Sequence, residues 1–151
     1  GLVNVCNIHL QSGDLDFALQ QFQEILVYMR GKTYPFIIIG DFNIDAIRNQ
    51  PLISPQNHFY PIIINNQIII TQKSGGCLDY AYSEMYPPLE YGRLAYPEEL
   101  SDHAPVVYIF KSKYNQLFFC PTRQMGGTGF NLLRPFSFSV ASYGFVCIAI
   151  S

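Results

Sequence analysis

The sequence predicts an α/β fold, because one segment of helical periodicity lies between segments of strand periodicity. A strand, a helix and a second strand are expected within residues 2–39, and three more apolar runs follow further along the chain. The chain has 151 residues, of which 49 % are hydrophobic and 13 % are charged. This length and composition suit one globular domain with its own core.

The first strand and the helix have the clearest patterns. Residues 2–10 form the expected strand, which is apolar on both faces at first. The helix is expected from about Asp14, a suitable N-cap residue, to Arg30. Apolar residues recur at helical spacing: Leu15, Ala18, Leu19, Phe22, Ile25, Leu26 and Met29. Gly31 is a plausible C′ residue, and Pro35 prevents the helix from continuing.

The remaining strands are short. Residues 36–39 form a β-branched run that stops at Gly40, which is typical of a strand covered on both faces. A loop-rich stretch with three prolines follows, and Gly75 and Gly76 mark a later turn. Three further strands are expected at residues 68–71, 78–82 and 105–110.

The character of the chain changes near residue 112. Residues 115–151 contain only two charged residues. We therefore divide the chain into residues 1–112 and a tail, residues 113–151, to which the sequence assigns no role. Residues 139–150 are apolar but shorter than the roughly 20 residues of a membrane-spanning helix, so no membrane span is expected.

Charge and cysteine spacing limit the possible environments. A net charge of −2 gives no broad attraction to phosphate backbones, although a metal enzyme can neutralise the reacting phosphate with its cation. The four cysteines lack the close spacing of zinc sites or redox dithiols, and we expect buried free thiols. They are Cys6, Cys77, Cys120 and Cys147. An intracellular location is therefore expected, with no indication of the compartment.

Four polar clusters lie at or near strand ends, where ligands of α/β enzymes gather. They are Asn7 with His9, Asp41 with Asn43, Asp79, and Asp102 with His103. On an extended chain Asp41 and Asn43 face one side, where a carboxylate can bind Mg²⁺ or hold a water that the amide orients. The same Gly-Asp-Phe-Asn segment would also suit a plain turn.

The other clusters have similar alternatives. His103 suits proton transfer near neutral pH, although Ser101 and Asp102 are also common capping residues. Asp79 lies in an apolar run, where a carboxylate needs a partner such as histidine; on an exposed edge it would be a solvated charge. His58 has no such context, and we expect it in a surface loop.

The order of these clusters resembles the C-terminal motifs of the endonuclease/exonuclease/phosphatase superfamily. The matching segments are Asn7–Leu10, Gly40–Asn43, Leu78–Tyr80 and Ser101–Val106. The family cleaves phosphoester bonds, and the resemblance covers about residues 2–111. It implies part of a four-layer α/β/β/α sandwich of the DNase I-like type, with the active site at one end.

The resemblance also implies roles for the carboxylates and amides. Asp41 would activate the attacking water, and Asn43 would position that water and the phosphate. Asp102 would be a metal-associated carboxylate, with Asp41 beside the same metal. The implied cofactor is Mg²⁺, with Mn²⁺ as an alternative. Asn7 would lie in the phosphate pocket.

The histidines receive roles in the same way. His103 resembles the histidine beside the scissile phosphate, with Asp79 as its orienting partner. His9 resembles a second histidine that contacts the phosphate or protonates the leaving oxygen. Complete members also have an N-terminal half with an Asn and a Glu that binds Mg²⁺, and neither has a counterpart here. Because the chain starts at Gly1 in an apolar segment, we expect that this half is missing and is the natural partner.

Three functions remain open from the sequence. The first is hydrolysis of a nucleic-acid phosphodiester by an activated water with Mg²⁺. The negative net charge and the lack of a clustered strip of basic residues argue against a nucleic-acid substrate. The second is a lipid or inositol-phosphate phosphoesterase with residues 86–96 as a rim. The third is a truncated, inactive or binding-only copy.

Overall fold

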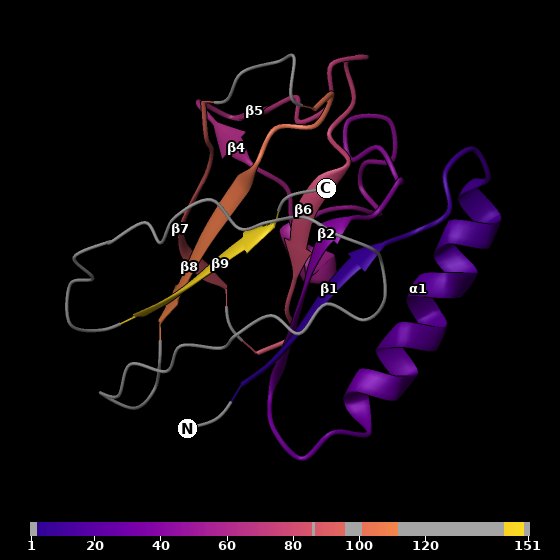
Figure 1. The fold of residues 1–151 in the computed structure, drawn as a ribbon, viewed down its shortest axis with the longest axis vertical. Helices are drawn as coiled ribbons and strands as arrows, with labels where there is room; N and C mark the ends of the chain where they lie inside the picture. Colours follow the sequence, from indigo (N-terminus) through magenta and orange to yellow (C-terminus); the bar gives the residue numbers. More distant parts are fainter. Residues whose placement is uncertain (1–2, 86, 96–100, 112–143, 150–151) are drawn as a thin grey trace.

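The computed structural model describes residues 3–85, 87–95, 101–111 and 144–149, which form a mixed α/β fold of mainly strands with one α-helix (Figure 1). In chain order the elements are β1 (Asn4–His9), α1 (Leu15–Arg30), β2 (Phe36–Asp41), the 3₁₀ helix η1 (Pro55–Asn57), β3 (Phe59–Tyr60), β4 (Ile63–Ile64), β5 (Gln67–Ile68), β6 (Asp79–Tyr82), β7 (Pro88–Arg93), β8 (Val106–Lys111) and β9 (Gly144–Ala149).

The central sheet has the strand order β1-β2-β6-β3. Strands β1 and β2 are parallel and are connected by α1, which confirms the expected strand–helix–strand unit. Strand β6 runs antiparallel to β2, so Asp79 at its start lies opposite Asp41 at the end of β2. This register brings polar strand ends together at one edge of the sheet.

Helix α1 covers one face of this sheet. Asp14 caps it as expected, because the Asp14 carboxylate accepts the Phe17 N–H at 3.0 Å. The buried face is Ala18, Phe22, Leu26 and Met29. Phe22 packs against Phe42, with ring centroids 5.7 Å apart, and both belong to the core between helix and sheet. Gly31 ends the helix at φ −75°, so the end needs no left-handed residue.

A second core lies on the other face of the sheet. Strand β2 is buried along its whole length: Phe36 and Ile38 belong to the helix-side core, whereas Ile37 and Ile39 belong to the second core. The second core also contains Val106, Tyr108 and Phe110 of β8. The sheet β7-β8-β9 therefore forms a third layer opposite α1 (Figure 1). The described residues give three layers, and the four-layer sandwich stays a prediction.

The expected strand at residues 68–71 is wrong beyond Ile68, where β5 ends. Asn65 and Asn66 have φ values of +52° and +62° and form the tight turn between β4 and β5. After Ile68 the chain leaves this hairpin, and Ile70 remains 44 % exposed. The β-branched run predicted a strand, but the segment instead brings Thr71 to the loop before β6.

Four strands were not expected, namely β3, β4, β7 and β9. Strand β7 lies in the stretch that we interpreted as a rim, and Tyr86 and Tyr96 at its margins lie outside the described residues. Strand β9 lies in the tail and pairs antiparallel with β8 from Val106 to Lys111. Strand β7 has a mixed composition with no clear strand periodicity. Strand β9 lies far along the chain from the other expected strands, in the tail to which the sequence assigned no role.

The remaining expectations concern single side chains and the membrane. Cys77 is a buried free thiol and Cys6 is a partly buried one, while Cys120 and the side chain of Cys147 lie outside the described residues. His58 is exposed in the loop after η1, as expected. Over the described ranges, no helix is long and apolar enough to cross a membrane.

Candidate active site

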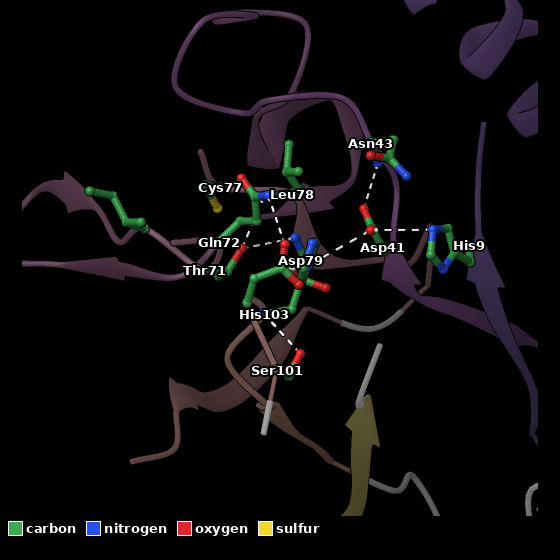
Figure 2. A network of polar contacts seen from close by, with 12 residues as sticks. His9, Asp41, Asn43, Thr71, Gln72, Cys77, Leu78, Asp79, Ser101 and His103 are labelled. Atoms are coloured by element: carbon green, nitrogen blue, oxygen red, sulfur yellow. Dashed lines mark hydrogen bonds and ion pairs between the residues drawn. The ribbon is translucent and has the colours of Figure 1, made fainter. Parts of the chain in front are cut away.

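The candidate site lies at the edge of the central sheet where β1 and β2 end and β6 begins. In the strand register His9 is beside Asp41, and Asp41 is opposite Asp79. His103 reaches the same place from the loop before β8 (Figure 2). Four polar side chains from four distant segments therefore meet, as the sequence predicted for strand ends.

The distances define a connected group. His103 Nδ1 lies 2.9 Å from Asp79 Oδ2 and 3.7 Å from Asp41 Oδ2. His9 Nε2 lies 3.7 Å from the same Asp41 oxygen. The side chains of Asp41 and Asp79 are only 2 % and 3 % exposed, whereas that of His9 is 69 % exposed. Two buried carboxylates are thus flanked by one partly buried and one exposed imidazole.

Asn43 is held by a turn that Asp41 itself forms. The Asn43 backbone N–H donates to Asp41 Oδ1 at 2.8 Å, and Asn43 has a φ of +51°. Its side-chain amide nitrogen donates to the Leu10 carbonyl at 2.7 Å. The segment is therefore a turn as well as part of the candidate site, and the amide group ties it to the end of β1. The phosphate-binding role of Asn43 stays a prediction.

Gly40 allows β1 and β2 to approach closely beside the site. Its φ is +140°, and an added Cβ would lie 2.1 Å from the Ile8 carbonyl oxygen and 2.9 Å from Asn7 Oδ1. Only glycine fits this position. Asn7 is exposed and pairs in register with Ile39, one residue before Gly40. The Asn7 side chain therefore lies beside Gly40, and its phosphate-binding role stays a prediction.

Asp102 is not brought into this group. Its side chain is exposed, and its Oδ2 accepts the Gln72 side-chain amide at 3.4 Å. The neighbouring Ser101 hydroxyl accepts the backbone N–H of His103 at 3.0 Å, which fixes the loop that carries the imidazole. The metal-binding role of Asp102 stays a prediction that this geometry does not support.

Burial controls the electrostatics of the site. The pKa of Asp41 is raised, first by burial, while the backbone N–H of Asn43 acts in the opposite direction. The nearby Asp79 charge raises the pKa further, and His103 and His9 lower it. Two carboxylates in one buried site favour the uptake of positive charge, either a proton or a cation.

The donor set fits a divalent cation. Among the described residues, ligand atoms of Asp41, Asp79 and His103 lie within 4.8 Å of one another. Carboxylate oxygens suit Mg²⁺, and the added imidazole nitrogen makes the set equally suitable for Mn²⁺. The His103 ring nitrogen is also engaged with Asp79, so the two carboxylates are the better candidates for holding the cation.

Sequence reasoning missed two residues that hold the site together. The Thr71 hydroxyl accepts the backbone N–H groups of Leu78 and Asp79, and Asp45 Oδ1 accepts that of Cys77. Thr71 ends an isoleucine run, and Asp45 follows Asn43 by two residues. Thr71 could have been noticed as a polar residue at the end of an apolar run. Its hydrogen-bonding partners could not be predicted from the sequence.

Comparisons of the chain with protein-family models, with curated proteins and with solved structures found no match.

Proposed function

We propose that the chain forms the active site of a metal-dependent phosphoesterase that hydrolyses a phosphodiester with an activated water. The observation that carries this proposal is the convergence of His9, Asp41, Asp79 and His103 at one sheet edge, with Asp79 and His103 hydrogen-bonded at 2.9 Å. A carboxylate–imidazole pair beside a second carboxylate supplies the groups needed for proton transfer near a phosphate.

The buried pair defines the first role. A carboxylate that accepts the Nδ1–H of a histidine fixes the tautomer and leaves Nε2 available as a base. In this arrangement Asp79 orients His103, and His103 Nε2 faces the reacting phosphate as a base or as a donor to the phosphoryl oxygen. The partial burial of His103 protects this pair from competing water.

Asp41 and His9 would act on the attacking water and on the leaving oxygen. Burial raises the pKa of Asp41 in the metal-free site. With the cation bound, the Asp41 carboxylate would be a ligand that also accepts a hydrogen bond from the attacking water and orients it. His9 is exposed and lies on the other side of Asp41, where it can protonate the leaving oxygen. The two imidazoles thus serve opposite ends of the reaction.

Asp41 and Asp79 would hold the cation. When bound, Mg²⁺ or Mn²⁺ would supply positive charge for the phosphoryl oxygens of the substrate. The family pattern adds a Glu from an N-terminal half-domain, and we propose that this half completes the metal coordination. The assignment of a nucleic acid as substrate rests on the sequence motifs alone.

The test is hydrolysis by purified protein with Mg²⁺ or Mn²⁺, using supercoiled plasmid, an abasic-site duplex, sphingomyelin and an inositol polyphosphate. We expect metal-dependent cleavage of DNA that falls by at least about 100-fold in Asp41→Asn and in His103→Gln. Asp16→Asn is the matched control, because it removes a carboxylate from the exposed start of α1, and it should leave the rate unchanged.

The other outcomes are equally informative. Cleavage of sphingomyelin or the inositol polyphosphate instead of DNA would assign the lipid or inositol-phosphate branch. Metal binding without turnover of any substrate would support the binding-only copy or a site that needs the N-terminal half for turnover. Equal activity in wild type and Asp41→Asn would refute the site.

A further inference from the structure

The segment before β6 is held by side chains from two other loops. The backbone N–H groups of Leu78 and Asp79 donate to the same Thr71 oxygen, at 3.0 and 3.1 Å, and the N–H of Cys77 donates to Asp45 at 3.1 Å. Thr71 is only 2 % exposed. A single buried hydroxyl therefore fixes the backbone that presents the Asp79 carboxylate (Figure 2).

The backbone around Thr71 also holds the loop of His103. The Ala104 N–H donates to the Thr71 carbonyl at 2.7 Å, and the Lys73 N–H donates to the Asp102 carbonyl at 2.8 Å. Between these two bonds, Gln72 and His103 form an antiparallel bridge. The residues that follow β5 thus hold the His103 loop through two backbone hydrogen bonds and one isolated bridge.

These contacts meet at one residue. Asp79 and His103 are 24 positions apart, yet their side chains must keep a 2.9 Å hydrogen bond. Thr71 contacts the Asp79 backbone through its side chain and the His103 loop through its main chain. Productive sites require such groups to be held within about 0.5 Å, which normally needs supporting hydrogen bonds.

We propose that Thr71 is a positioning residue that sets the alignment of the Asp79–His103 pair. This inference rests on the proposed function, in which that pair faces the phosphate. The hydroxyl is the essential group, because it accepts both amides of the Asp79 segment. Removing it leaves the partly buried N–H of Leu78 and the buried N–H of Asp79 without that acceptor, and lets Asp79 shift relative to His103.

The variants separate this role from general stability. Thr71→Val keeps the shape and removes the hydroxyl, whereas Thr71→Ser keeps the hydroxyl. The matched control is Tyr108→Phe, which removes another buried hydroxyl, one that donates to the Tyr60 carbonyl at 2.6 Å in the second core. Thr71→Val and Tyr108→Phe therefore each lose one internal hydrogen-bonding group, but only the first lies at the site.

The first measurement is the ¹⁵N chemical shifts of the His103 ring in metal-free protein, at a pH where the ring is neutral. We expect wild type, Thr71→Ser and Tyr108→Phe to hold the proton on Nδ1, facing Asp79. Thr71→Val should show a mixture of both tautomers. A wild-type tautomer in Thr71→Val would overturn the proposal.

The second measurement is steady-state hydrolysis. We expect kcat of Thr71→Val to fall about 10- to 100-fold, the scale of a small misplacement of catalytic groups, with KM within about twofold of wild type. Thr71→Ser should restore most of the rate. A loss of rate in Tyr108→Phe equal to that in Thr71→Val would show a merely structural effect and would overturn the proposal.

Two provisions keep the test decisive. If Thr71→Val does not fold, Thr71→Cys places a weaker acceptor at the same position and should give a tautomer mixture between those of wild type and Thr71→Val. The proton held on Nδ1 alone, as in wild type, would contradict the role. The tautomer measurement needs no substrate, so the absence of hydrolysis with a Thr71-dependent tautomer would refute only the proposed function. Hydrolysis that is insensitive to Thr71→Val would refute only the positioning role.

Discussion

Asp41 is the residue at which burial and charge conflict most directly. It is 1 % exposed, and its pKa is raised mainly by burial and further by the charge of Asp79. The Asn43 backbone N–H and the two histidines offset part of this effect. An ionised Asp41 therefore destabilises the folded protein when no cation is bound.

A first prediction follows for Asp41→Asn. In metal-free buffer at pH 7, we expect the free energy of unfolding to rise by about 1 kcal/mol, because the substitution removes a buried negative charge. Because the folded pKa lies above the unfolded pKa, the stabilising contribution of protonated Asp41 is complete below the unfolded pKa. It is lost as the pH rises through the folded pKa.

The gain from Asp41→Asn should therefore be largest above the folded pKa and should disappear below the ordinary pKa range of aspartate. Urea unfolding over a series of pH values measures it, with Asp16→Asn as the control. A lower stability of Asp41→Asn than of wild type at pH 7 would contradict the electrostatic account.

The roles of some single residues could be predicted from the sequence, and the roles of others could not. Asp79 was predicted to have a histidine partner, because a carboxylate in an apolar run needs one, and His103 is that partner at 2.9 Å. Thr71 could not be identified in this way. Its two acceptor contacts depend on where the Leu78 backbone lies, and that position comes from the folding of a separate loop.

Among the elements, strand β2 depends on the absence of a side chain at Gly40. The Ile8 carbonyl oxygen of β1 occupies the space that a Cβ would need, at 2.1 Å. Because this contact is with backbone, no side-chain rotation relieves it. Strand β1 would have to move away from β2, and His9 would move away from Asp41 with it.

A second prediction follows for Gly40→Ala. We expect it to lower the free energy of unfolding by more than about 3 kcal/mol, which is in the range of severe backbone clashes. Gly75→Ala is the matched control, because Gly75 also has a positive φ, +106°, but faces open space. Thermal unfolding followed by circular dichroism compares the two, and equal losses would show that conformational strain alone accounts for Gly40.

The helices and strands also show which structural features can be predicted from adjacent residues alone. Helix α1 was predicted closely, because helical spacing and the Asp14 cap are properties of adjacent residues. The run at residues 68–71 has the same β-branched composition as β2, yet only Ile68 belongs to a strand. Strand formation there depends on a pairing partner, and composition alone does not supply one.

At the scale of the whole molecule, the candidate site lies at the sheet edge, between the helix-side core and the second core. The central sheet contributes His9, Asp41 and Asp79, while the loop before the third layer contributes His103. This arrangement buries two carboxylates in one place. A divalent cation that binds the folded state should therefore stabilise the whole domain.

A third prediction concerns this linkage. Mn²⁺ or Mg²⁺ at about 100 times its dissociation constant should raise the free energy of unfolding of wild type by about 2.7 kcal/mol. We expect the gain to be lost in Asp41→Asn and in Asp79→Asn and to be retained in Asp16→Asn. Thermal unfolding over a metal titration measures it.

One further variant tests the residue that the structure leaves apart. Asp102→Asn should retain the metal-dependent gain, because the Asp102 carboxylate is exposed and contacts Gln72. Loss of the gain in Asp102→Asn would restore the role that the sequence motif implied. An equal gain in wild type and Asp41→Asn would place the cation elsewhere.

The sequence by itself determined the strand–helix–strand unit and the polar strand ends, because periodicity, capping and the cost of a buried carboxylate are properties of neighbouring residues. Only the tertiary structure decided that β9 joins the third layer, that Asp102 faces away and that Thr71 links Asp79 to His103. These outcomes depend on strand register and on contacts between distant segments. Such contacts become favourable only after the chain has folded around both cores.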